Sequence, residues 1–184
     1  MVRAWYMDED EEYPKNEHHR IPPKFVTLEE LYQTSGVEYF QISPENYIAD
    51  TTLKELLEER GNNIQQIVEN PDDEELKKHW TEHFHSDEEF RLVLDGCGYF
   101  DVRDKYDEWI RVEVLPGDLI VIPGGCYHRF MLDNQNKYKG LRILKDPVYQ
   151  AHCRPSEEMN CRKEYIKKLF NGAFDGPKDE IILA

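Results

Sequence analysis

The sequence predicts a mainly β protein with added helices, in which the strands form a single barrel or sandwich. Between residues 90 and 144, short runs of β-forming residues follow one another closely and are separated by turns rich in Gly and Pro. This pattern is typical of small barrels and sandwiches. Between residues 27 and 81, apolar residues recur instead at helical spacing. The length of 184 residues suits one domain with a sizeable core.

The N-terminal part is expected to be helical after an irregular start. Residues 8–23 are acidic and polar, which is typical of a loop or a loosely held arm. Thr27 and Glu30 have the spacing of a capping box, and Gly61 is a helix stop signal. Residues 64–69 could form a short helix or a strand. We expect helices at residues 26–34, 51–60 and 72–81.

The remainder is expected to consist of strands and a closing helix. A turn signal at residues 95–98 indicates a hairpin inside the longest strand-like run. Residues 156–170 are expected to form a C-terminal helix. We expect strands at residues 37–42, 90–102, 109–115, 119–122, 127–132 and 140–144. The expected organisation is one domain over residues 1–170, with N-terminal helices at about 27–81, a β core at about 80–150 and a tail at 171–184.

The charge balance excludes several classes of partner. The chain has 38 acidic and 23 basic residues, a formal net charge of −15, and its basic residues are dispersed. Such a surface repels phosphate, so no nucleic-acid partner is expected. The longest apolar run, residues 119–122, is far shorter than the roughly 20 residues that span a membrane. Without an apolar signal core or a CxxC pair, we expect a cytosolic protein that can also reach the nucleus.

A cluster of metal-binding residue types begins at His83. Side chains alternate between the faces of a strand, so a continuous strand would direct His83, His85, Glu89 and Arg91 to one side. Two imidazoles and a carboxylate can bind a divalent metal, as in oxygen-activating non-haem iron sites. Taken alone, a His-x-His pair near a Glu in an acidic protein is more often a surface feature.

A second stretch supports the metal-binding interpretation. The residues from Gly117 to His128 read GDLIVIPGGCYH. Its Gly and Pro turns flank a short strand, so that His128 can face the same interior as the first cluster.

The two stretches together resemble the two motifs of the cupin superfamily. The first motif, H-x-H-x3-E-x6-G, and the second, G-x5-P-x-G-x2-H, are matched by His83, His85, Glu89, Gly96, Gly117, Pro123, Gly125 and His128. Leu132 stands where the second motif often ends in Asn, a position that is not a ligand. The resemblance implies a double-stranded β-helix, or jelly-roll, barrel with a helical N-terminal region.

A closer resemblance is to the acireductone dioxygenase family of the methionine salvage pathway. It rests on AWYM at residues 4–7, GYFDVRD at 98–104 and YHRF at 127–130, and extends over about residues 1–170. The resemblance implies one Fe(II) or Ni(II) ion per chain. It also implies a substrate-contacting and catalytic role for Arg91, and the metal ligands His83, His85, Glu89 and His128.

The implied enzyme cleaves 1,2-dihydroxy-3-keto-5-methylthiopentene with O2. In the family, the Fe(II) form gives formate and 4-methylthio-2-oxobutanoate. The Ni(II) form gives carbon monoxide, formate and 3-methylthiopropanoate. The expected partners are therefore a small-molecule substrate and O2, and we expect a monomer.

Further residues are assigned to substrate binding, each with a structural alternative. Arg142 is expected to orient the substrate, and Phe84, Phe130 and Tyr149 to form an apolar wall for the methylthio tail. The alternatives are that Arg91 pairs with an interior acid, that Arg142 is structural and that the two Phe side chains only fill the barrel.

Residues near the motifs are expected to have no chemical role. His79 is expected on the surface of its helix, and Glu88 is expected to face outward. Cys126 is expected to be a packing residue.

Two other functions are compatible with the sequence. One is a cupin dioxygenase or isomerase that acts on another small enolisable substrate. The other is a non-catalytic, metal-binding cupin.

Overall fold

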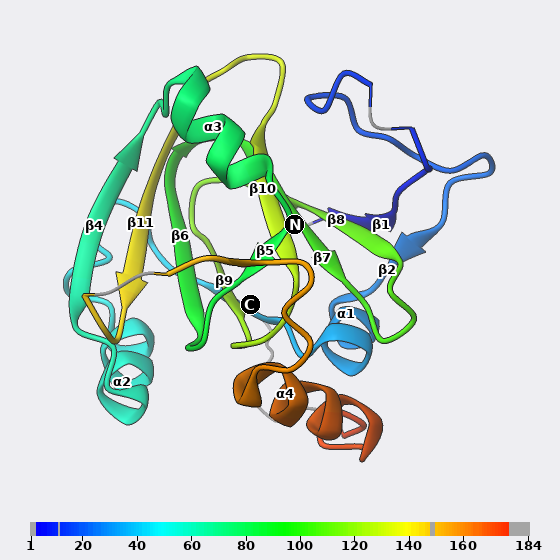
Figure 1. The fold of residues 1–184 in the computed structure, drawn as a ribbon. Coiled ribbons are helices and arrows are strands. Elements are labelled where there is room, and N and C mark those ends of the chain that lie inside the picture. Colours follow the sequence, from blue (N-terminus) through cyan, green and yellow to red (C-terminus); the bar gives the residue numbers. More distant parts are fainter. Residues whose placement is uncertain (1–2, 11, 148–149, 177–184) are drawn as a thin grey trace.

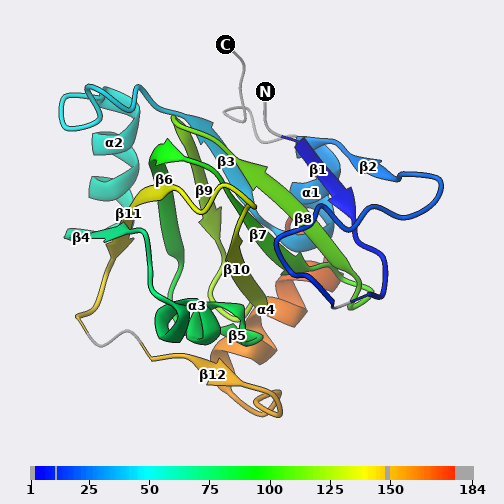
Figure 2. The ribbon, with the colours of Figure 1, turned by 90° about the horizontal axis from the view of Figure 1, so that it is seen from above.

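Two antiparallel sheets face each other in the computed structural model, which describes residues 3–10, 12–147 and 150–176 (Figures 1 and 2). The seven-stranded sheet has the order β12-β5-β10-β7-β8-β1-β2. Its strands are β1 (Arg3–Tyr6), β2 (Phe25–Val26), β5 (His83–Phe84), β7 (Gly98–Arg103), β8 (Trp109–Val114), β10 (His128–Leu132) and β12 (His152–Cys153). The five-stranded sheet has the order β3-β9-β6-β11-β4. Its strands are β3 (Glu38–Gln41), β4 (Ile64–Glu69), β6 (Glu89–Gly96), β9 (Asp118–Ile122) and β11 (Tyr138–Leu144).

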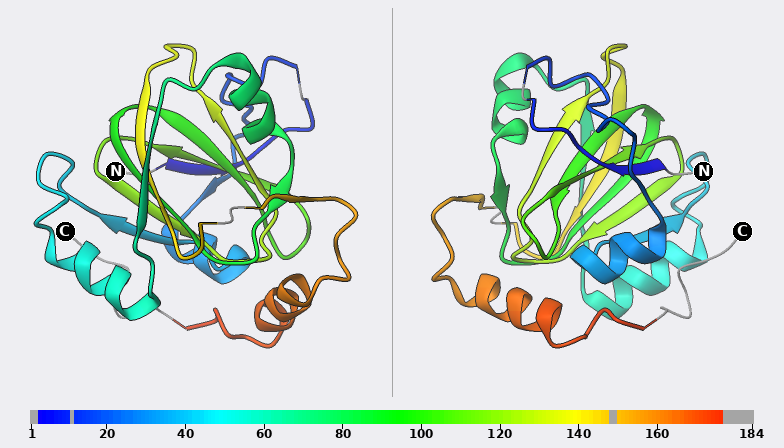
Figure 3. Two further views of the ribbon diagram at one scale, coloured as in Figure 1. Left: turned by 60° about the vertical axis from the view of Figure 1, so that its left-hand side comes forward. Right: turned by 90° about the vertical axis from the view of Figure 1, so that its right-hand side faces the viewer.

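Helices cover the barrel from outside. They are α1 (Leu28–Ser35), α2 (Thr51–Arg60), α3 (Asp73–Trp80) and α4 (Asn160–Phe170). Helix α3 lies at the opposite end of the barrel from α1, α2 and α4 (Figures 1 and 3). No helix in the described part of the chain combines the length and apolar character needed to cross a membrane.

The apolar core has two parts, because the five-stranded sheet is covered on both faces. Between the sheets, alternate side chains such as Val112 and Ile120 are fully buried. On the outer face, Leu53 of α2 packs with the alternate side chains Phe90 and Leu92 of β6. Burial on both faces explains why β9 carries a nearly continuous apolar run rather than a simple alternation.

The helix signals in the sequence are confirmed. The side chain of Thr27 accepts from the backbone N–H of Glu30, and the Glu30 side chain accepts from the Thr27 N–H, which completes the predicted capping box. Helix α2 ends at Gly61 in the left-handed conformation, as predicted. Residues 64–69, which could have formed a short helix or a strand, form the edge strand β4. Its alternate residues are partly buried against β11.

The predicted hairpin at residues 95–98 is wrong. Strand β6 pairs with β9 and β11, whereas β7 pairs with β8 and β10, so the two strands belong to different sheets. Gly96 has φ +78°, and a Cβ there would lie 2.0 Å from the carbonyl oxygen of Lys137. The Gly-rich turn therefore carries the chain from one sheet to the other. Local turn chemistry identifies such a bend but not the partners of its strands.

Contacts between residues distant in sequence hold the N-terminal loop and the residues that follow α4. The N-terminal loop is fastened by Trp5, whose indole N–H donates to the Glu17 carbonyl at 2.7 Å, and by Arg111, which donates to the Pro14 carbonyl at 3.2 Å. After α4, the ring of Phe174 lies 5.4 Å from that of Tyr32.

Candidate metal centre

The histidines of the two motifs meet where the chain crosses between the sheets. His83 on β5 and His128 on β10 are direct cross-strand neighbours, with ring centroids 4.7 Å apart. His85 follows β5, and Glu89 opens β6 in the opposite sheet. The four residues do not lie on one continuous strand, because residues 85–88 are irregular. The crossing nevertheless brings all four side chains together.

The turn of the second motif supports this crossing segment. Gly125 has φ +85°, and its backbone N–H donates to the carbonyl of His85 at 2.9 Å. A Cβ at the neighbouring Gly124 would lie 2.4 Å from the carbonyl oxygen of Ser86. The Gly-Gly pair therefore lets the two motifs approach closely, which only residues without a side chain permit.

Each imidazole is oriented by a hydrogen bond to the backbone. A carbonyl can only accept, so each Nδ1 must carry the proton, and the lone pair of each neutral ring is then on Nε2. The Nδ1-to-oxygen distances are 2.6 Å for His83 to Thr81, 2.8 Å for His85 to Gln150 and 2.9 Å for His128 to Cys126.

The candidate ligand atoms converge in a buried space. One nitrogen from each of His83, His85 and His128 lies within 4.8 Å of the others. The Oε2 atom of Glu89 lies 3.1 Å from Nε2 of His128 and 3.3 Å from Nε2 of His85. Glu89 is only 1% exposed. A carboxylate oxygen and imidazole lone pairs repel one another unless a cation lies between them, so this donor set fits a divalent metal ion.

The protonation states also fit a metal. Burial, together with the neighbouring imidazoles, lowers the pKa of His83 to about 3, and burial lowers that of His85 to about 4. Both rings are therefore neutral near pH 7. Burial alone would raise the pKa of Glu89, but Arg91 and His128 outweigh it and hold the pKa well below its usual value. The carboxylate is thus ionised and ready to bind a cation.

Arg91 and Arg142 lie side by side at the edge of this cluster. Arg91 shares a face of β6 with Glu89, is 5% exposed, and donates through Nε to the Glu89 carboxylate. Arg142 is its cross-strand neighbour on β11 and donates through Nε to Oε1 of Gln66 at 3.2 Å. The ion pair of Arg91 with an interior acid, the structural alternative for this residue, is thus present.

An aromatic wall adjoins the cluster, and we use that name for Phe100, Phe130 and Tyr138. The ring of Phe130 lies 4.7 Å from that of Phe100 and 4.8 Å from that of Tyr138. Cζ of Arg91 lies 5.9 Å from the Phe100 ring. Phe130 shares a face of β10 with His128 because the two are separated by one residue.

One of the predicted wall residues, Phe84, is not part of this wall. Phe84 alternates away from the cluster, and its ring lies 5.0 Å from that of Tyr127 and 5.4 Å from that of His152. Tyr149 lies outside the described residues. Cys126 is fully buried in the core between the sheets, as expected of a packing residue.

His79 is the residue near this site that the sequence analysis missed. It is half-buried rather than on the surface, and its ring lies 6.1 Å from that of Phe130. Burial, together with the positive charge of Arg91, lowers its pKa to about 4. The spacing of Leu76, His79 and Trp80 along one face of α3 was the signal that could have placed it.

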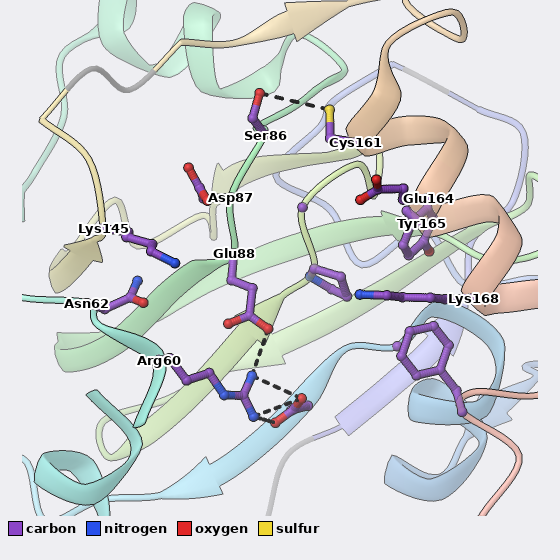
Figure 4. Close-up of a pocket in the computed structure, with 15 residues that line it drawn as sticks. Arg60, Asn62, Ser86, Asp87, Glu88, Lys145, Cys161, Glu164, Tyr165 and Lys168 are labelled. Carbon is purple, nitrogen blue, oxygen red and sulfur yellow. Dashed lines mark hydrogen bonds and ion pairs between the residues drawn. The ribbon is translucent and has the colours of Figure 1, made fainter. Parts of the chain in front are cut away.

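The crossing segment is also anchored on its outer side. Glu88 faces away from the cluster, as expected, and accepts from Nη1 of Arg60 at 2.7 Å (Figure 4). Arg60 also donates to Glu38 at 2.9 Å. A cavity of about 280 Å³ lies between this ion-pair group and α4.

Comparisons with known proteins assign this chain to one family. Residues 3–151 match the family model described as ARD/ARD′. An acireductone dioxygenase of Drosophila melanogaster is 48% identical over 174 residues, which cover 91% of this chain and 94% of that protein. Acireductone dioxygenase 1 of Vitis vinifera is 45% identical over 175 residues, which cover 91% of this chain and 92% of that protein.

A solved structure shows the same fold. The acireductone dioxygenase of Bacillus anthracis, with a cadmium ion in its active centre, superposes with a TM-score of 0.64 at 20% sequence identity. The match covers 82% of this chain and 97% of that one. The predicted fold class, a cupin barrel with added helices, is confirmed.

Proposed function

The chain belongs to the ARD/ARD′ family, and from this premise we propose that it cleaves acireductone with O2 at the cluster of His83, His85, Glu89 and His128. The observation that carries the proposal is the convergence of three oriented imidazoles on one buried, ionised carboxylate. The cadmium ion in the active centre of the Bacillus anthracis relative supports a metal at this place.

The four side chains would hold the metal through three nitrogens and one oxygen. A bound divalent ion supplies a Lewis acid and a template on which a substrate can chelate through two adjacent oxygens. Three neutral imidazoles and one carboxylate leave such an ion with a charge of +1, which favours binding of an anionic enediolate. The ligand atoms are N and O donors, the set that suits first-row metals such as iron and nickel.

Arg91 has two tasks in this proposal. Its positive charge keeps Glu89 ionised in the buried site. Its guanidinium also offers several donors in a fixed fork, which suits an enolate oxygen of the substrate. Arg142, held by Gln66 beside Arg91, would add positive charge on the same side of the site.

The burial of the site limits access of water. His83, His85 and His128 are at most 6% exposed, and the aromatic wall closes the interior behind them. In such a site, electrostatic interactions with the substrate are stronger than in water. The wall would also receive the apolar methylthio tail, for which aromatic rings are favourable contacts.

The products depend on the bound metal. With Fe(II), the six-carbon substrate and O2 would give formate and 4-methylthio-2-oxobutanoate, a precursor of methionine. With Ni(II), they would give formate, carbon monoxide and 3-methylthiopropanoate. The same N and O ligands bind Ni(II) more tightly than Fe(II), so metal availability in the cell would decide which reaction runs.

The names of the relatives favour this substrate over another enolisable compound, and they favour an enzyme over a non-catalytic cupin. The monomeric state and the cytosolic and nuclear location stay predictions.

The test is a comparison of metal-free, iron and nickel forms of the purified protein. Each form receives acireductone and O2, and substrate loss and products are followed. We expect turnover by both metal forms, with carbon monoxide from the nickel form alone. Absence of acireductone consumption by both metal forms would overturn the proposal.

A further inference from the structure

Tyr138 carries a buried hydroxyl that no described residue satisfies. The residue opens β11 and is 1% exposed, and its hydroxyl oxygen has no hydrogen-bond partner within the described part of the chain. Most buried hydroxyl groups are hydrogen-bonded, because leaving one unpaired costs free energy. A Phe would fill the same space without that cost.

Gly140 makes room for this hydroxyl. A Cβ at Gly140 would lie 2.3 Å from the hydroxyl oxygen of Tyr138, so a side chain there is excluded by the ring. Since residues 138 and 140 share a face of the strand, the Tyr138 side chain extends along β11 inside the barrel towards Arg142. Two positions of β11 are thus arranged to hold one unpaired polar atom.

The hydroxyl lies on the side of the aromatic wall that faces the candidate metal centre. The ring packs on Phe130, which shares a face of β10 with His128. The charges of Arg91 and Glu89 also act on the Tyr138 hydroxyl, which places it within electrostatic range of the cluster. Burial raises its pKa to about 12, so the group is a neutral hydrogen-bond donor at neutral pH.

We propose that Tyr138 determines specificity for the substrate tail, with its hydroxyl donating a hydrogen bond to the thioether sulfur. This inference rests on the proposed function, which fixes the dihydroxy-keto end of the substrate at the metal. The tail then runs past Arg91 along an apolar aromatic surface. A thioether sulfur is a weak acceptor that packs favourably on aromatic rings, so it matches a wall with a single unpaired donor.

The test compares the thioether with a methylene group at the same position. The ligands are 4-methylthio-2-oxobutanoate and 2-oxohexanoate, which differ only by sulfur or CH2, and their affinities are measured on the metal-loaded protein. The corresponding pair of acireductones is compared by kcat/KM. We expect the wild type to prefer sulfur, and Tyr138→Phe to reduce that preference about three- to tenfold, chiefly through Kd and KM. The melting temperature of Tyr138→Phe should equal or exceed that of the wild type.

Tyr39→Phe is the matched control. The Tyr39 hydroxyl is also buried, but it donates to Asp118 at 2.8 Å, and Asp118 lies at the opposite end of β9 from Ile122, the residue that pairs with Glu89. Its removal should lower the melting temperature and leave the sulfur preference unchanged. An unchanged sulfur preference in Tyr138→Phe would overturn the inference. Failure of the wild type to consume acireductone would instead refute the proposed function itself.

Discussion

The properties of the candidate ligands are set residue by residue through backbone contacts. Each of the three imidazoles donates its Nδ1 proton to a main-chain carbonyl, and two of these carbonyls lie only two residues away in the sequence, at Thr81 and Cys126. The orientation of these rings is therefore largely local. The carbonyl of Gln150 orients His85 from a distant segment.

His83→Ala should lower both the metal content and the activity. Changes to residues that only orient a ligand cost about 10- to 100-fold in metal affinity, so loss of a ligand should cost more than about 100-fold. The measurement is metal content after dialysis against a weak chelator. His152→Ala, which removes a ring packed on Phe84 outside the cluster, is the control and should keep its metal. Full occupancy in His83→Ala would show that the ligand assignment is wrong.

Arg91→Ala should retain metal but lose turnover by at least about 100-fold, the usual cost of removing a donor to a developing oxyanion. It should also destabilise the metal-free protein by about 3–5 kcal/mol, because Glu89 is left as an uncompensated buried charge. Bound metal replaces the missing positive charge. The difference in unfolding free energy between Arg91→Ala and the wild type should therefore be smaller in the metal-loaded form. Denaturant unfolding of both forms measures this.

Arg91→Lys separates the two tasks of Arg91. It keeps the positive charge and should preserve the stability of the metal-free protein, but a Lys lacks the planar fork and should not restore turnover. Turnover in Arg91→Ala equal to that of the wild type would leave Arg91 with a structural role only.

At the scale of elements, the segment between β5 and β6 is held at two points. The Gly124–Gly125 turn contacts Ser86 and the His85 carbonyl. Arg60 at the end of α2 binds Glu88 (Figure 4). We therefore expect helix α2, from which none of the candidate ligands comes, to help fix the position of Glu89 relative to the histidines.

Arg60→Gln should weaken this outer anchor. Glu38 is buried, and loss of its partner should cost about 1–3 kcal/mol of stability. We also expect about tenfold weaker metal binding, as for residues that position ligands. Lys78→Gln is the control, because its pair with Glu74 is exposed on α3 and should change stability by no more than about 0.5 kcal/mol. If Arg60→Gln binds metal with wild-type affinity, α2 does not help to position the ligands.

At the scale of the whole molecule, the buried histidines make the metal-free fold sensitive to acid. The pKa values of His79, His83 and His85 are lowered from 6.5 to about 4, 3 and 4. Above pH 6.5 the folded and unfolded chains bind these protons equally. Below it, the unfolded chain takes up protons that the folded chain does not, so stability falls until the folded values are reached.

Stability of the metal-free protein should therefore decline between pH 6.5 and about pH 4. Each histidine should contribute a slope approaching about 1.4 kcal/mol per pH unit. Urea unfolding at a series of pH values measures the slope of stability against pH. His79→Gln should reduce this slope by the contribution of one histidine. A stability that does not change over this range would contradict the burial of these rings.

Features that depend on local geometry could be predicted from the amino-acid sequence alone. The capping box at Thr27, the left-handed glycine after α2 and the residue types of the candidate metal centre all follow from short patterns, because backbone dihedrals and donor chemistry are properties of a few neighbouring residues. The resemblance of the two motifs to those of cupins predicted the fold class, and the stretches at residues 4–7, 98–104 and 127–130 predicted the family.

The meeting of distant segments could be seen only in the three-dimensional structure. There β6 and β7 belong to different sheets, residues 85–88 lie outside both strands, His79 is turned inward and Tyr138 lies on the aromatic wall. Phe84 and Phe130 are both Phe residues next to a motif histidine or close to one, but Phe84 packs on Tyr127 and not on the aromatic wall. The reason is physical: strand pairing and side-chain burial depend on contacts between residues far apart in the chain, which short patterns do not encode.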